Sequence, residues 1–524
     1  MGLFFVPSDT SSTLGGVDTA IGDALSAAYS ASMSWIILAV LLGGGIYLTI
    51  RSRGVQFREF GHMVKTIFGS RKGAGDAGIS SFQAFALGLA DRVGTGNIAG
   101  VAIALTLGGP GAIFWMWVVA FLGMSTAFLE STLAQMFKIR NPDGTFRGGP
   151  AFYLLSGLKH THLAQVFAVF LILTKGCAFE MLQANTVSNV VSDTYHVPTW
   201  TMALILFLIS APFIIGGVKP VARLTEFLAP VMAIAYLVLA LIMLVVNYDQ
   251  IPTVFVWIFT YAFGVRTVAG GVVGGIVVGL IQGTKRGLLS NEAGMGTVPN
   301  AAATATVSHP VKQGLIQSFG VFADTMIVCT CTALILMLSG VYNPEVAQGK
   351  PNGATMTLHA VGTLGDWTTP LMVVIIVVFG YSTMLGNFAY AEGNIKFLRG
   401  VDAKCNELRA LVLVSIVLGS VIQLPVVWAI ADWMSALCAI INIYAVVRLS
   451  KWSIGALRDY QAQRNAGTAL DDIIFVSDHN PYLPGELPSD LWSRKEWAAT
   501  VEAHVKDAPH THEDFLEWYV RQSD

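Results

Sequence analysis

The stretch ALGLADRVGTGNIAG, residues 86–100, decides the fold because it interrupts an apolar segment with glycines and polar groups. Asp91, Arg92, Thr95 and Asn97 all stand where hydrocarbon contact is expected. Backbone that unwinds at membrane depth persists only where it faces protein or a water-filled cavity. The stretch therefore predicts a transmembrane helix that is broken in its middle.

The composition around this stretch is that of a polytopic membrane protein. Of the 524 residues, 54% are hydrophobic and 12% are charged. An ordinary soluble domain has ~25% charged residues. The mean hydropathy is +0.62. Long apolar runs predict eleven spans, near residues 33–50, 80–107, 110–138, 161–191, 199–217, 224–247, 251–282, 311–340, 368–396, 408–425 and 427–448.

The basic residues orient these spans, because cytoplasmic loops carry an excess of Lys and Arg. Loops on one side hold 27 of the 31 basic residues, and the opposite loops hold only Lys350. The remaining three, Arg92, Lys175 and Arg266, fall within spans. We therefore expect the N-terminus outside the cell and the C-terminal tail in the cytoplasm.

A second interrupted segment is expected at 260–275, TYAFGVRTVAGGVVGG, which has five glycines and Arg266. Paired interrupted helices in two oppositely oriented halves are typical of secondary transporters. The sequence thus predicts an all-α fold with two inverted five-helix repeats, each with a broken first helix, after one extra helix. The alternative interpretation is that these glycines do not interrupt a helix and only allow close helix packing. The expected divisions are an extracytoplasmic segment at 1–32, a first helix and basic cytoplasmic loop at 33–79, repeats at 80–247 and 248–448, and a cytoplasmic tail at 449–524.

Several function classes are excluded by what the chain lacks. A net charge of −2 gives no basic stripe for nucleic acid. No GxxxxGK[ST] loop is present, so no nucleotide is expected. The predicted spans contain no His in their cores, which argues against haem or a transition-metal site. No nucleophile and base pair up in the spans, so we expect no enzyme.

The broken segment at 86–100 supplies the groups that amino-acid and sodium binding need. A half-helix N-terminus offers free N–H groups and partial positive charge, which suit a carboxylate. Unwound carbonyls suit a dehydrated sodium ion. Phe179 and Gln183 are four residues apart and share a helix face, so one could cover a ligand while the other hydrogen-bonds it.

Other polar residues in the spans have two readings each. Ser382 and Thr383 either bond back to their own helix or complete an all-oxygen sodium site. Glu180 is interpreted as a structural partner of Lys175 or a water-lined group. The motif SNEAG at 290–294 is interpreted as a cytoplasmic helix start and a gate element. We expect pairing or water contact near helix ends for Glu130, Asp324, Glu392 and Asp432.

Five motifs carry a family resemblance, namely RVGTGNIAG at 92–100, GGPAFY at 148–153, QAN at 183–185, GLLSNEAGMG at 287–296 and HPVKQGL at 309–315. Together they resemble the alanine or glycine:cation symporter family of bacteria and archaea. The resemblance implies two inverted five-helix repeats and sodium-coupled uptake of small neutral amino acids by alternating access. It also implies the cytoplasmic membrane of a prokaryote.

The resemblance also implies site residues. The substrate would be held by residues of both broken helices and of the fourth span, namely Thr95, Gly96, Asn97, Phe179, Gln183, Thr267, Gly270 and Gly271. The sodium ion would be bound by the carbonyls of Ala90, Val93 and Phe379 and by the hydroxyls of Ser382 and Thr383.

Three positions depart from the family pattern. The family usually has Ser where Asp91 stands, Thr-Pro-Gln where residues 264–266 stand, and Trp where Asn387 stands. Arg266 and Asn387 would then make the substrate pocket larger or more polar than an alanine site. Alternatively, Asp91 and Arg266 neutralise each other across the two broken helices. Asp91 and its neighbour Arg92 are thus candidates for charge partners or gate residues.

The sequence therefore predicts a secondary active transporter in which a sodium gradient drives an amino acid into the cell. Its partners would be the amino acid, sodium and the lipid bilayer, with no obligatory protein partner and no other cofactor. A transporter-like amino-acid sensor and a proton-coupled amino-acid transporter are the alternatives. A channel would need pore-lining rings, which the single pair of broken helices does not offer.

Overall fold

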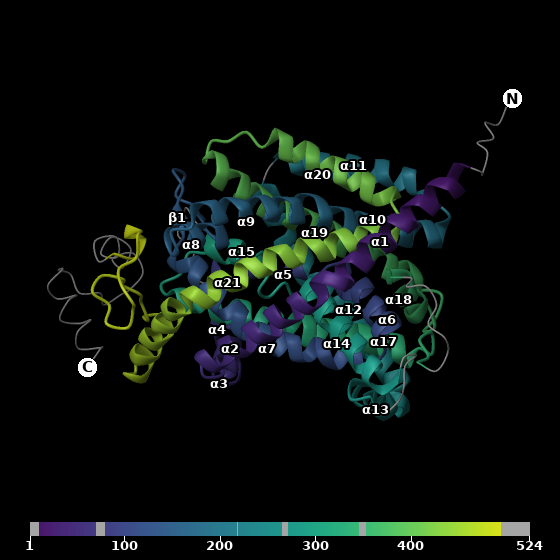
Figure 1. Ribbon diagram of the computed structural model, residues 1–524, viewed down its shortest axis with the longest axis horizontal. Helices are drawn as coiled ribbons and strands as arrows, with labels where there is room; N and C mark the ends of the chain where they lie inside the picture. Colours follow the sequence, from purple (N-terminus) through teal and green to yellow (C-terminus); the bar gives the residue numbers. More distant parts are fainter. Residues whose placement is uncertain (1–9, 70–78, 217, 265–270, 345–352, 494–524) are drawn as a thin grey trace.

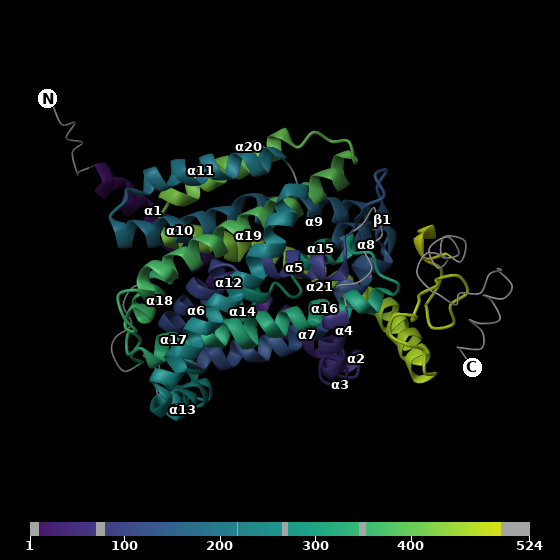
Figure 2. The same ribbon diagram turned by 180° about the vertical axis from the view of Figure 1, so that it is seen from behind.

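The computed structural model of the chain describes residues 10–69, 79–216, 218–264, 271–344 and 353–493. These residues are almost all helical, apart from connections and one antiparallel hairpin. Long helices run side by side along the longest axis of the molecule (Figures 1 and 2). The hairpin and the end of the last long helix lie at one end of the bundle, called the tail end below (Figure 1).

The chain folds into the following elements up to residue 262: α1 (Thr10–Leu38), η1 (Ala39–Gly43), α2 (Gly44–Arg51), α3 (Val55–Arg58), α4 (Phe60–Gly69), α5 (Ser81–Arg92), η2 (Gly96–Gly100), α6 (Val101–Gly108), α7 (Gly111–Met136), β1 (Ile139–Arg140), β2 (Phe146–Arg147), α8 (Pro150–Ser156), α9 (Thr161–Leu173), η3 (Thr174–Ala178), α10 (Phe179–Tyr195), α11 (Thr199–Gly216), α12 (Val218–Val246), η4 (Tyr248–Gln250) and α13 (Ile251–Ala262). The remaining elements are α14 (Gly271–Asn291), α15 (Val298–Thr304), α16 (Pro310–Val321), η5 (Phe322–Cys329), α17 (Thr330–Leu338), α18 (Gly353–Gly362), α19 (Thr368–Arg399), α20 (Asn406–Val421), α21 (Leu424–Asn465) and η6 (Asp490–Trp492).

Seven helices in the described residues are long and apolar enough to cross a membrane. An eighth is added if Ala233–Val246 and Tyr248–Ala262, which are bent by 81°, form one broken span. The described chain therefore has the helices of a multi-pass membrane protein. Eleven spans are not confirmed as a count, because an interrupted helix such as Gly96–Gly108 is too short to span alone.

The first helix break is confirmed. α5 starts at a capping box, in which Ser80 accepts from the Gln83 backbone and the Gln83 side chain accepts from the Ser80 backbone. It ends at Arg92, and helical structure resumes at Gly96. The break therefore covers residues 93–95, within the stretch that the sequence singled out.

The second break lies elsewhere than predicted. α13 ends at Ala262, whereas α14 runs without interruption from Gly271 to Asn291. Left-handed backbone follows α14 instead, with φ of +56° at Glu292, +86° at Gly294 and +83° at Gly296. The span expected at 251–282 is divided between α13 and α14, and residues 265–270 of the interruption expected there lie outside the described residues. The motif SNEAG is an interior helix break rather than a cytoplasmic helix start.

Close helix packing explains why a prediction based on glycines did not locate this break. A Cβ on Gly283 would lie 2.5 Å from the carbonyl oxygen of Ala112, so α14 approaches α7 closely there. Small residues allow such backbone contact in membrane proteins. Glycines within α14 thus resembled part of a break although α14 itself is an uninterrupted helix. Lys285 and Arg286 lie within α14 and pair with Asp432, so they do not belong to a cytoplasmic loop.

The two ends of the chain also differ from the expected divisions. α1 already begins at Thr10, inside the segment expected to precede the first helix. α21 continues to Asn465, well beyond the boundary expected at 448. Residues after α21 then fold back onto the tail end of the bundle, where the Phe475 N–H donates to the Ser308 carbonyl at 2.9 Å.

Candidate functional site

Gly94 lies at the centre of the first break and admits no side chain. A Cβ there would collide with the Thr383 hydroxyl of α19 and would come within 3.3 Å of Gln183 Oε1 of α10. The Gly94 N–H donates to Asn97 Oδ1 at 3.1 Å, which closes the turn. The break is thus the point at which α10 and α19 meet α5.

Thr95 and Gln183, both predicted substrate residues, contact each other. Gln183 Oε1 accepts from the Thr95 backbone N–H at 3.1 Å and from the Thr95 hydroxyl at 2.7 Å. Both side chains are buried. Phe179, one turn before Gln183, is also buried and places its ring 4.6 Å from the ammonium of Lys175. A ligand at the break would meet these residues together.

The predicted sodium residues are also brought together in part. The Thr383 hydroxyl donates to the Ala90 carbonyl at 3.0 Å, which joins α19 to the last turn of α5. The Ser382 hydroxyl donates to the Phe379 carbonyl at 3.0 Å, within α19 itself. Val93 is buried at the break. The structure thus joins Thr383 and Ala90 at the end of α5, and it places Ser382 and the Phe379 carbonyl together within α19. All four oxygens are hard donors that suit sodium.

The second break is fixed by hydrogen bonds from two long helices. The Gly294 N–H donates to Glu130 of α7 at 3.2 Å. Asn442 of α21 donates to Glu130 at 2.6 Å and to the Gly294 carbonyl at 2.9 Å. These bonds satisfy backbone groups that the interruption releases from the helix. Glu130 therefore lies at the second break and not near a helix end as expected.

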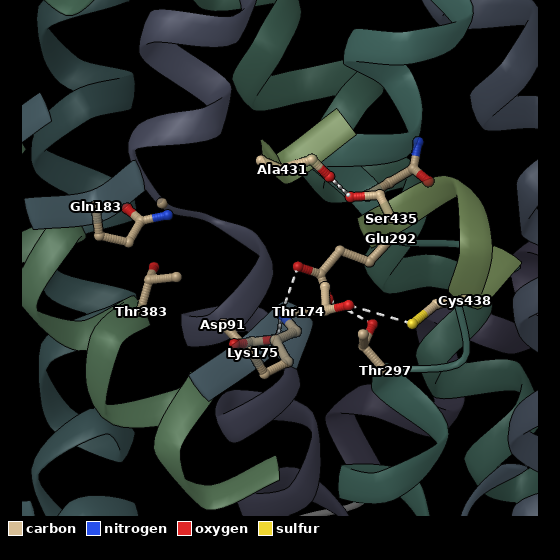
Figure 3. Close-up of polar contacts among 12 residues, drawn as sticks. Asp91, Thr174, Lys175, Gln183, Glu292, Thr297, Thr383, Ala431, Ser435 and Cys438 are labelled. Carbon is tan, nitrogen blue, oxygen red and sulfur yellow. Dashed lines mark hydrogen bonds and ion pairs between the residues drawn. The ribbon is translucent and has the colours of Figure 1, made fainter. Parts of the chain in front are cut away.

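Lys175 connects the two breaks. Its ammonium contacts Asp91 at 2.7 Å, at the end of α5, and Glu292 at 2.6 Å, just after α14. All three side chains are buried, and Figure 3 shows Lys175 beside Asp91 with a dashed line toward Glu292. Glu292 also accepts from the Thr297 hydroxyl at 2.5 Å. One cation of the π-helical turn η3 thus bridges carboxylates of both interrupted helices.

This ion cluster contradicts the expected pairing of Glu180 with Lys175, and it does not test the alternative pairing of Asp91 with Arg266. Glu180 does not bond to Lys175, and neither of its carboxylate oxygens has a hydrogen-bond partner among the described residues. The reason is that Asp91 and Glu292 already occupy the ammonium. The alternative partner of Asp91, Arg266, lies outside the described residues, as do Thr267 and Gly270.

Asn97 faces the second half of the chain. Its amide nitrogen donates to Asp324 Oδ1 at 2.5 Å and to the Ser290 hydroxyl at 3.2 Å. Its amide oxygen is taken by the Gly94 N–H. Asn97 therefore links the two breaks in this structure, in addition to the Lys175 cluster.

The other predicted substrate residues are placed differently. Gly96 begins η2 beside the first break. Gly271 begins α14, and 20 residues of helix, about 30 Å at ~1.5 Å per residue, separate it from the second break. Gly271 is therefore not part of that break. Asn387 is fully buried on α19, and neither amide atom has a hydrogen-bond partner among the described residues. Arg92 is buried and donates to the Gln317 carbonyl at 3.2 Å.

Sequence reasoning missed Glu292, Glu130, Asp324 and Ser290 as site residues. Their signal was present, because acidic side chains in apolar segments are costly and mark functional sites. The motif SNEAG, which contains Ser290 and Glu292, was interpreted as a cytoplasmic helix start and a gate element rather than as part of a binding site. No group of three or more His, Cys, Asp or Glu side chains in the described residues could hold a metal ion together.

A multi-pass helical protein whose polar side chains converge on two interrupted helices has the construction of a secondary transporter. Comparison with known proteins agrees with this class. The description of the family that matches residues 18–473 is the sodium:alanine symporter family. The chain belongs to this family, which is a family of transporters.

Three relatives illustrate the similarity. The chain is 44% identical over 458 residues, 87% of its length and 94% of the other protein, to an uncharacterized transporter of Haemophilus influenzae. It is 42% identical over 446 residues (85% and 91%) to the probable sodium/glutamine symporter GlnT of Bacillus subtilis. It is 40% identical over 461 residues (88% and 95%) to the amino-acid carrier protein AlsT of Bacillus subtilis. The family and these relatives support a sodium-coupled amino-acid symporter.

Proposed function

We propose that the chain carries a small neutral amino acid, of the alanine, glycine or glutamine kind, into the cell together with sodium. The observation that carries this proposal is the meeting of Gln183, Thr383 and the unwound backbone at Gly94. The Gln183 amide and the buried Thr95 hydroxyl beside it can hold the substrate. The Ala90 carbonyl and the Thr383 hydroxyl can hold sodium. Both ligands would then order the same three-residue break.

This shared break provides the thermodynamic coupling. Unwound backbone loses conformational freedom when it binds a ligand, and the second ligand pays less of that cost. Sodium bound between Ala90 and Thr383 therefore strengthens amino-acid binding at Thr95, and the amino acid strengthens sodium binding equally. A sodium gradient can then drive accumulation of the amino acid by alternating access.

The two interrupted helices also support inverted repeats. The chain just before α5 contacts the chain just after α15, since the Thr306 N–H donates to the Ile79 carbonyl at 3.0 Å. At the other end, a Cβ on Gly279 of α14 would lie 3.2 Å from the carbonyl of Gly108, which ends α6. The two broken helices therefore run antiparallel. We infer that repeats starting at α5 and α14 form the transporter body.

The pocket is proposed to accept more than alanine. Asn387 lies one turn beyond Thr383 on α19, so both project from the same helix face. Its amide, which has no partner among the described residues, can donate to and accept from a polar side chain such as the carboxamide of glutamine. Replacing Asn387 by Trp should narrow the preference toward alanine and glycine.

Uptake into proteoliposomes tests the proposal. Labelled alanine, glycine, glutamine and glutamate are offered to purified protein with an inward sodium gradient or with potassium in its place. We expect accumulation of neutral amino acids only with the sodium gradient. Sodium-independent uptake would contradict the proposal and favour the proton-coupled alternative. Binding without any flux would contradict it and favour the sensor alternative.

A matched pair of variants locates the sodium site. Thr383→Ala removes a hydroxyl at the break and should raise the sodium concentration for half-maximal uptake about tenfold, the equivalent of ~1.4 kcal/mol. Thr106→Ala is the control, because the Thr106 hydroxyl donates to the Ala102 carbonyl of its own helix at 2.8 Å. This control should leave the sodium dependence unchanged.

A further inference from the structure

Asp324 is a fully buried carboxylate in the middle of an apolar helix. It lies in η5, the π-helical segment between α16 and α17, within a candidate span that runs from Pro310 to Leu338. Its side chain is 0% exposed. Wide π-helical turns occur often at functional sites because they redirect side chains out of the regular helical pattern.

Three neutral groups from three elements converge on this carboxylate. Asn97 of η2 donates to Asp324 Oδ1 at 2.5 Å. On the other side, Oδ2 accepts a very short bond from the Ser290 hydroxyl of α14 and a 2.9 Å bond from the Thr325 hydroxyl. The two hydroxyl oxygens are 3.2 Å apart, and both side chains are 0% exposed.

No basic side chain of the described residues forms an ion pair with Asp324. Arg92 interacts with it through charge alone, since its guanidinium donates to the Gln317 carbonyl. A carboxylate in the interior of a membrane protein is expensive unless a cation compensates it. When ionised, Asp324 therefore has two hydroxyl oxygens beside its negative charge and no direct counter-ion within the described part of the chain.

We propose that Asp324 Oδ2, Ser290 Oγ and Thr325 Oγ1 form a second binding site for a monovalent cation, namely sodium. The proposal rests on the proposed sodium symport and adds a site apart from Ala90 and Thr383. All three ligands are hard oxygen donors, which suit sodium and not a transition metal. The Asn97 amide nitrogen stays on Oδ1, away from the cation.

The hydroxyls can turn from donors to ligands when a cation enters. The Ser290 hydroxyl has Cys329 Sγ 3.0 Å away as another acceptor for its proton. The Thr325 hydroxyl already accepts from the Asn291 amide at 3.1 Å, so its oxygen is held in place. Rotation of the Ser290 hydroxyl toward Cys329 would free lone pairs of its oxygen for the cation.

The location gives this site a role in coupling. Ser290 lies two residues before Glu292 at the second break, and Asn97 lies two residues after Thr95 at the first. A cation on Asp324 would therefore stabilise the arrangement in which both breaks are joined. With the first sodium at Ala90 and Thr383, two ions would accompany each substrate and steepen the sodium dependence.

Equilibrium binding of radioactive sodium to the purified full-length protein in detergent tests the proposal without transport. We expect two sodium ions per chain in the wild type and one in Asp324→Asn, whose amide keeps the shape but not the charge. Thr383→Ala should bind sodium about tenfold more weakly at the other site, so that it too binds one ion at a sodium concentration that just saturates the wild type. Ser290→Ala should still bind two, with at least one of them more weakly.

The controls separate this proposal from the proposed function. Asp193→Asn should still bind two ions, because the exposed Asp193 accepts a 2.9 Å bond from the Thr355 hydroxyl outside the breaks. Wild-type protein that binds no sodium would overturn both proposals. One ion in the wild type, retained in Asp324→Asn and lost in Thr383→Ala, would overturn only the second site. Thermal unfolding of each variant in potassium shows whether it is folded.

Discussion

Lys175 is the residue on which the two helix breaks depend most. A single ammonium between Asp91 and Glu292 leaves the three side chains with a net charge of −1 if all are ionised. Phe179 and Tyr390 add ring faces 4.6 and 5.5 Å from the ammonium. A buried cation with two anionic partners compensates its own desolvation, but the partners become costly when it is removed.

Removal of the Lys175 charge should therefore destabilise the protein strongly. Lys175→Met keeps the length of the side chain and leaves two buried carboxylates unpaired, which should cost about 3–5 kcal/mol. Thermal unfolding in detergent measures the loss. Adding Asp91→Asn and Glu292→Gln to the same chain should restore most of it. Lys396→Met is the control, because its pair with Glu392 is partly exposed, and such pairs are worth about 0–1 kcal/mol.

At the scale of elements, the segment after α21 is held against the tail end by Lys138 and Trp492. The Trp492 ring N–H donates to the Gln135 carbonyl at 3.0 Å, and the Lys138 ammonium lies 5.2 Å from the centre of the Trp492 ring. Lys138 also donates to the Ala305 carbonyl at 2.8 Å. Burial, and then the charge of Arg140, lower the pKa of Lys138 to about 7.

Docking of this segment should strengthen as the pH rises. Release of Trp492 uncovers part of Lys138, so the pKa of its ammonium should move toward the ordinary value of ~10.4 and the released state should bind more protons than the docked one. Between the docked pKa of about 7 and that value, stability therefore rises with pH, and it is lowest below pH 7. Hydrogen exchange at residues 473–476 at pH 7 and pH 9 measures the effect. Lys138→Met should abolish the slope, whereas the exposed Lys159→Met should retain it.

The elements also show what could be predicted from the sequence. The first break was predictable because Asp91, Thr95 and Asn97 are polar in an apolar helix. The second was not, because its glycines at 294 and 296 follow a long glycine-rich helix that looks interrupted but packs closely. The partners of Lys175 are 84 and 117 residues away in the chain, so only the fold brings them together.

The whole molecule is asymmetric in charge along the axis that its helices follow. Counted along the sequence, 27 basic residues were assigned to the tail side, and the placement of Lys285 and Arg286 inside α14 leaves 25. The opposite loops still hold only Lys350. The basic residues therefore still predict that the tail end lies in the cytoplasm.

Labelling of two matched cysteine variants tests this orientation. Asp366 and Asp402 are both exposed, and they lie just before α19 and just after it, so the full length of α19 separates them. A membrane-impermeant maleimide should label Asp366→Cys in intact cells and Asp402→Cys only after permeabilisation. The wild type corrects for Cys177 and Cys331, which are partly buried. The reverse labelling would place the C-terminal segment outside, and the start of α5 would then face the exterior.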